Sequence, residues 1–153
     1  MTPVVLTKEN IAVLHSQLIV KKPRDAFLSG MGTLEGFEKN LGNCVMFLAF
    51  SWGICWLTQI QDKTYEAHFF CWGSGIFASI PKIRSLIGEV IKLSSCDRVF
   101  AQVDARSHGL ARIMLRLGFS YEGRARRGIR YFDGSFTDGD VYARVKADEE
   151  EAK

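Results

Sequence analysis

The spacing of hydrophobic residues between positions 44 and 72 predicts three consecutive strands. Residues 44–51, 54–61 and 64–72 are rich in apolar and β-branched side chains, and Asp62-Lys63 between the last two is typical of a hairpin turn. Links this short join antiparallel strands, so the segment is expected to form a meander. In the third strand, Glu66 and His68 fall on the same face because side chains alternate along a strand.

Elsewhere the apolar residues recur every three to four positions, which indicates helices. One helix is expected after Thr7 and ends near Lys22-Pro23, and a short or broken helix is expected within 24–43. Another is expected to open at Pro81, because proline is favoured in the first turn of a helix.

The clearest signal lies in residues 97–119. Positions 98–103 alternate as a strand does, and the period then changes to that of a helix. Ser107 is expected to cap this helix with its side chain, and Gly118 to end it in a left-handed conformation. After it, residues 121–132 and 140–145 resemble a hairpin, with Asp133-Gly134 and Asp138-Gly139 as turn residues.

These elements predict an α+β (three-layer) fold with a mixed, mostly antiparallel central sheet and about four helices. A doubly wound nucleotide-binding fold is disfavoured, because the first three strands follow one another without crossover helices. The length of 153 residues suits one domain, expected over residues 1–147. The acidic residues 148–153 are expected to form a frayed tail.

Composition limits where the protein is expected to be found and which partners it is expected to bind. Apolar residues make up 47% and charged residues 24%, and no apolar run reaches the length of a membrane span. The N-terminus lacks the features of a signal peptide, so we expect a cytoplasmic protein with no membrane partner. The four cysteines are widely spaced, which predicts free thiols and no metal site. The net charge of +3 is too small to indicate nucleic acid by itself.

The order of these elements resembles that of the GCN5-related N-acetyltransferase (GNAT) superfamily over nearly the whole chain. Two segments carry the resemblance: Phe70 to Gly75, placed like the family's Gln/Arg-x-x-Gly-x-Gly/Ala loop, and Ser107 to Phe119, which looks like its Asn-x-x-Ser…Gly-Phe helix. The resemblance implies that acetyl-CoA is the cofactor. Residues Gly73, Ser74, Gly75 and Ser107 would then contact it, and the strands beside the loop would splay apart to admit it.

The resemblance also implies a catalytic role for Glu66 as the base that takes a proton from the acceptor amine, with His68 beside it. The alternative for these two residues is a solvated pair on an open sheet face. For Ser74 and Ser79 the alternative to phosphate contact is that they cap a helix.

A cluster of arginines forms the other candidate surface, consisting of Arg124, Arg126, Arg127 and Arg130. It is suited to the 3′-phosphate of CoA, to an acidic protein partner or to nucleic acid, or it is simply a solvated hairpin. Nucleic acid is disfavoured, because no aromatic residues are interleaved for base stacking.

Three positions depart from the family pattern. Phe70 replaces the Gln or Arg of the loop, Ser107 replaces an Asn, and Met114 stands where many members carry a tyrosine that protonates the leaving thiolate. A thioether cannot donate that proton. The main hypothesis from sequence is therefore a protein that resembles the small GNAT-fold proteins of short-tailed bacteriophages. It would act in head assembly or in packaging internal proteins for DNA ejection, through protein contacts in the host cytoplasm. The alternative is an active acetyl-CoA-dependent N-acetyltransferase that acts on a small-molecule or protein amine.

Overall fold

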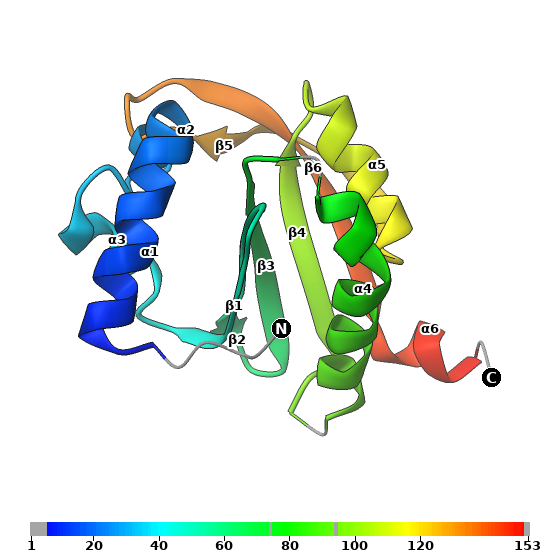
Figure 1. Ribbon diagram of the computed structural model, residues 1–153. Helices are drawn as coiled ribbons and strands as arrows, with labels where there is room; N and C mark the ends of the chain where they lie inside the picture. The colour runs from blue at the N-terminus through cyan, green and yellow to red at the C-terminus, as the bar shows by residue number, and fades with distance from the viewer. Residues whose placement is uncertain (1–5, 74, 94, 152–153) are drawn as a thin grey trace.

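A six-stranded mixed sheet forms the centre of the protein (Figure 1). The computed structural model describes residues 6–73, 75–93 and 95–151. The strands lie in the order β1-β2-β3-β4-β6-β5, and every neighbouring pair is antiparallel except β3 and β4. Their bounds are β1 (Cys44–Phe50), β2 (Gly53–Gln61), β3 (Thr64–Cys71), β4 (Arg98–Asp104), β5 (Ser120–Arg130) and β6 (Phe136–Val145).

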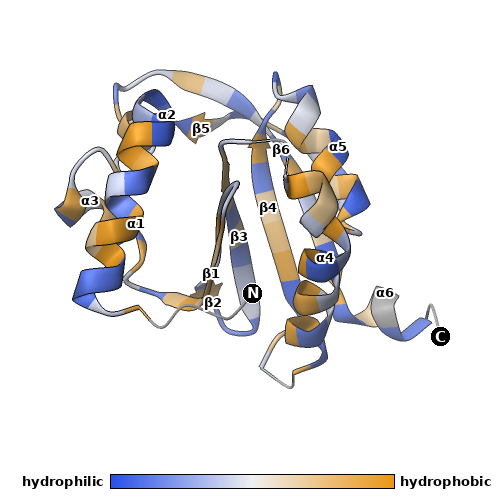
Figure 2. Cartoon of the chain, in the orientation of Figure 1, coloured by the Kyte–Doolittle hydropathy of each residue, from blue (hydrophilic) through white to orange (hydrophobic). Residues whose placement is uncertain are grey.

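Helices cover the sheet on both faces. On one side lie α1 (Lys8–Lys21), α2 (Pro23–Leu28) and α3 (Leu34–Asn40), and on the other lie α4 (Ile76–Lys92) and α5 (His108–Arg116) (Figure 1). A sixth helix, α6 (Lys146–Glu151), follows β6. Figure 2 shows the apolar stripes of α1 and α4. Each stripe belongs to one of two separate clusters of buried residues, one on each face of the sheet.

The expected α+β class and the mostly antiparallel sheet are confirmed. The described residues contain two more helices than the four expected. The region expected to hold one short or broken helix contains two, because α2 begins at Pro23 and α3 follows it. The helix α6 begins at Lys146, next to the segment expected to be a frayed tail. The domain boundary at residue 147 stays a prediction. None of the helices described is long and apolar enough to cross a membrane.

Two details of the strand predictions were wrong. The continuous apolar run 44–51 predicts a strand buried on both faces. β1 is instead an edge strand, and Val45 is half-exposed. Asp138-Gly139 lies inside β6 rather than in a turn, and the hairpin turn is built around Gly134, which has φ +84°. Both errors arise because neighbouring strands, which sequence spacing does not reveal, decide how far a strand extends and which face is covered.

The helix expected to open at Pro81 begins five residues earlier, at Ile76. Pro81 lies in its second turn, where it removes only one hydrogen bond. Ile76 and Ile80 extend the buried stripe of the helix toward its N-terminus, so burial favours the longer helix. The start of α4 therefore lies directly after the glycine loop.

Gly118 ends α5 as expected. It has φ +88°, and the amide of Phe119 donates to the carbonyl of Met114, which satisfies a free carbonyl in the last turn. Ser107 is the N-cap residue, but its side chain makes no capping bond, so that part of the expectation was wrong. Its amide instead donates to the carbonyl of Asp104, in the turn that joins β4 to α5.

The parallel pair β3 and β4 is hydrogen-bonded only at one end. The register joins Thr64 to Arg98, Tyr65 to Val99 and Glu66 to Phe100, and then stops. Residues 67–71 and 101–104 continue as strands, held by β2 and β6 on their other edges. The two strands therefore separate in the middle of the sheet, which confirms the expected splay.

A pair of alanine substitutions tests the end of α5. Gly118→Ala places a Cβ in the left-handed region and 3.2 Å from Nε of Arg84, so we expect it to lower the free energy of unfolding by about 1–2 kcal/mol. Gly109→Ala, within α5 and with open space at its Cβ, should instead raise it by up to about 1 kcal/mol. Urea unfolding measures both. Equal midpoints for wild type and Gly118→Ala would contradict the prediction.

Candidate functional site

A cavity of about 940 Å³ lies where β3 and β4 separate. Residues 66–71 of β3 and 101–104 of β4 form two of its walls. The others come from α5 as far as Met114, from the α1–α2 corner and the end of α2, and from residues 128–131 at the end of β5. The inner edges of the two strands have no partner strand along this cavity. Their amides and carbonyls are therefore free to bond a ligand that lies between them.

The cavity passes through the sheet. Leu110, Ile113 and Met114 of α5 line it on one face, whereas Leu28 and Ser29 at the end of α2 line it on the other. On that second face the β5–β6 turn lies against α2, because the amide of Phe132 donates to the carbonyl of Leu28. Elements from both faces of the sheet thus form the walls of one cavity.

Glu66 and His68 lie together inside this cavity. Oε2 of Glu66 is 3.6 Å from Nε2 of His68, and each side chain is less than one-third exposed. The imidazole stacks on the indole of Trp56, with ring centroids 4.9 Å apart. Burial lowers the pKa of His68 to about 4 and raises the pKa of Glu66. At neutral pH the imidazole is therefore uncharged. The catalytic role of the pair stays a prediction.

A polar cluster that the sequence did not indicate lies at the far end of β4. Asp104 accepts hydrogen bonds from the guanidinium of Arg106 at 2.6 Å and 3.0 Å, from the hydroxyl of Tyr131 at 2.6 Å and from Thr137 at 3.2 Å. The hydrogen bonds from Arg106 hold the pKa of Asp104 well below its usual range. Tyr131 thereby places a phenol on the cavity wall. Its contact with Asp104 spans 27 residues, so no local pattern reveals it.

Phe70 and Cys71 of the expected cofactor loop line the cavity, whereas Gly73 and Gly75 do not. Gly75 is the N-cap of α4, and a Cβ there would stand 2.9 Å from Cδ1 of Trp52. The indole of Trp52 also donates to Ser79 Oγ at 2.8 Å, so the expectation that Ser79 caps the helix was wrong. Gly73 has ordinary contact distances, and Ser74 lies outside the described residues. Close packing on Trp52 is thus one structural reason for glycine at position 75.

Ser107 lines the cavity, and the four arginines separate into different environments. Arg124 pairs with Asp140 at 2.7 Å, and Arg127 lies over the ring of Phe136. Arg126 is exposed on β5, and only Arg130 lines the cavity. The arginines therefore do not converge on one point, and their partner-binding role stays a prediction.

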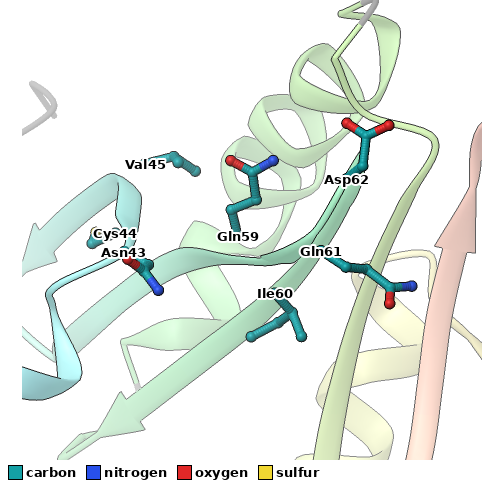
Figure 3. Close-up of a pocket in the computed structure, with 7 residues that line it drawn as sticks. All are labelled: Asn43, Cys44, Val45, Gln59, Ile60, Gln61 and Asp62. Carbon is teal, nitrogen blue, oxygen red and sulfur yellow. The ribbon is translucent and has the colours of Figure 1, made fainter.

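Other parts of the described chain offer less for chemistry. A second hollow of about 470 Å³ is formed by Asn43–Val45 and Gln59–Asp62, and Figure 3 shows its side chains spread along the strands rather than gathered around one point. Burial raises the pKa of Cys44 there to about 11, so its thiol is protonated. The described cysteines are free, and no group of three or more His, Cys, Asp or Glu residues among the described positions could hold a metal ion.

The pKa of His68 predicts how stability depends on pH. Between pH 6.5 and pH 4 the unfolded chain binds a proton at this residue and the folded chain does not, so stability falls as the pH falls. Between pH 7 and pH 5, the free energy of unfolding of His68→Gln should fall by about 2 kcal/mol less than that of wild type. Urea unfolding at both pH values measures this. The exposed His108 provides a control, and His108→Gln should follow wild type. An NMR titration that finds the pKa of His68 near 6.5 would contradict the prediction.

Comparison with solved structures identifies this architecture. An acetyltransferase of the GNAT family from Streptococcus pneumoniae matches with a TM-score of 0.69 and 21% identity over 94% of this chain and 98% of that one. The spermidine N-acetyltransferase of Vibrio cholerae matches with a TM-score of 0.72 and 10% identity over the full length of both chains. The microcin C7 self-immunity acetyltransferase, solved with acetyl-CoA and AMP, matches with a TM-score of 0.61 and 18% identity over 88% of this chain and 82% of that one. No protein-family model and no curated protein matches the sequence. The chain therefore has the fold of the GCN5-related N-acetyltransferases.

Proposed function

We propose that this protein is an acetyl-CoA-dependent N-acetyltransferase. One observation carries the proposal: β3 and β4 separate after Glu66 and Phe100, and the cavity between them reaches both faces of the sheet. A transferase needs two substrates side by side in one water-poor space, with their reacting atoms oriented toward each other. This cavity meets that requirement and contains a carboxylate beside an uncharged imidazole.

The residues present are suited to the cofactor. Free strand edges along residues 67–71 and 101–104 offer amides and carbonyls to the two amide groups of a pantetheine arm. The N-cap of α4 is Gly75, and no side chain among the described residues caps the helix there, so its first amides are available to phosphate oxygens. The structure solved with acetyl-CoA and AMP has the same fold, which supports this assignment of the cofactor.

Acetyl transfer requires an uncharged amine to attack the thioester carbonyl. The C–N bond forms, the C–S bond breaks, the amine loses a proton, and the leaving thiolate gains one. Asp25 and Asp104 each pair with a cation, so Glu66 is the cavity carboxylate that remains to accept the amine proton, with His68 beside it. Met114 cannot protonate the thiolate, but the phenol of Tyr131 lies on the wall of the same cavity.

The virion-assembly hypothesis takes second place. Its basis is the three motif departures, at Phe70, Ser107 and Met114. Phe70 and Met114 pack in the two buried clusters, and Ser107 lines the cavity, so all three positions are compatible with a cleft that binds a ligand. The similar structures named above are acetyltransferases, which gives a head-assembly role no support.

Two measurements test the proposal. Calorimetry should show that acetyl-CoA binds with micromolar affinity, and mass spectrometry should detect acetylated product from a panel of amines. Glu66→Gln should lower kcat by about 10²–10⁴-fold while leaving the acetyl-CoA affinity unchanged, because it removes a proton acceptor rather than a cofactor contact. The matched control is Glu89→Gln, which changes an exposed glutamate on α4 and should behave as wild type. The proposal fails if millimolar acetyl-CoA gives no binding heat.

A further inference from the structure

Six acidic and basic side chains line the cavity, and four of them neutralise one another in two pairs. Near the α1–α2 corner, Nζ of Lys22 lies 3.5 Å from Oδ2 of Asp25. At the end of β4, the guanidinium of Arg106 binds Asp104 with its Nη2 at 2.6 Å. The charges cancel within each of these pairs. The two charged side chains of the cavity that remain are Glu66, which is acidic, and Arg130, which is basic.

Arg130 is the cation on this wall that lacks a carboxylate. Within the described chain, no acidic oxygen lies within 4.0 Å of its guanidinium, which instead lies 5.8 Å from the ring centroid of Phe136. A cation–π contact does not use up the N–H donors of the guanidinium as a bond to an oxygen would. Those donors are therefore available to an anion.

The backbone around Arg130 is fixed, so its position on the wall is set by the fold. Arg130 is paired across the hairpin with Phe136, and the amide of the next residue, Tyr131, donates to the carbonyl of Ser135. The hydroxyl of Tyr131 is in turn held by Asp104. A guanidinium on a well-anchored strand end loses less conformational freedom when it binds an oxyanion than one on a mobile loop.

We propose that the acceptor is an amine that also carries a negatively charged group, a carboxylate or a phosphate, which Arg130 binds. This inference rests on the proposed function, since the amine must lie toward Glu66 and His68. A planar guanidinium bonds two oxygens of either group at once, which fixes the orientation of the acceptor as well as its affinity. The two uncompensated charges of the cavity thus match a substrate with one charge of each sign.

Matched pairs of amines test this specificity. β-Alanine is compared with β-alaninamide, and ethanolamine phosphate with ethanolamine, by kcat/KM with acetyl-CoA. We expect the charged member of at least one pair to be preferred by about 10–100-fold, and the pair that shows it distinguishes carboxylate from phosphate. Arg130→Gln should abolish the preference, and Arg130→Lys should retain part of it. Arg126 is an exposed arginine of the same strand that does not line the cavity, so Arg126→Gln should leave the preference for the charged amine unchanged.

Calorimetry of the same charged amines without acetyl-CoA gives a readout that needs no catalysis. Arg130→Gln should weaken their binding about tenfold or more while acetyl-CoA binds as to wild type. Equal kcat/KM for the charged and neutral members of both pairs would overturn this inference and leave the proposed function standing. If acetyl-CoA does not bind but the charged amines do so through Arg130, the proposed function fails, and the anion site remains.

Discussion

The early end of the hydrogen-bonded ladder between β3 and β4 is the constraint on which the site depends. Three residue pairs join the strands, from Thr64 and Arg98 to Glu66 and Phe100, and beyond them each strand is held only from its outer edge. Buried amides and carbonyls are costly when unpaired. Where the sheet opens in its middle, the backbone amides and carbonyls of both strands therefore need hydrogen-bond partners. A ligand with amide groups can provide them without any specialised side chain.

Packing on both faces fixes the positions of the two strands. Phe70 attaches β3 to the cluster beneath α1–α3. Tyr65 and Ala67 of β3 share the cluster beneath α4 and α5 with Val99 and Ala101 of β4. Closing the gap would therefore require the cluster that the two strands share to repack. Close-packed interiors resist such movement. Phe27 and Phe132, with ring centroids 5.5 Å apart, join α2 to the β5–β6 turn on the far side of the opening.

The chemistry of the cavity follows from its partial burial. The carboxyl of Glu66 and the imidazole of His68 each lose hydration there, and both shift toward the uncharged form, which raises the pKa of one and lowers that of the other. Asp104 shows the opposite behaviour, because Arg106 and Tyr131 supply the hydrogen bonds that its charged form needs. The cavity thus contains the ion pair of Asp104 and Arg106 together with Glu66 and His68, whose charged forms are disfavoured by burial. Such shifted pKa values are typical of sites that transfer protons.

The sequence by itself determined the elements and their order, because periodicity and turn residues act over a few neighbouring positions. It placed the meander, the strand and helix of residues 97–119, and the left-handed Gly118, and it grouped Glu66 with His68 because they lie two positions apart on one strand. Only the tertiary structure decided which residues complete the site. Tyr131 reaches Asp104 across 27 positions, and Arg130 lines the cavity whereas Arg124 of the same strand pairs with Asp140. These contacts depend on how β4, β5 and β6 are placed relative to one another, and no local spacing in the chain encodes that placement.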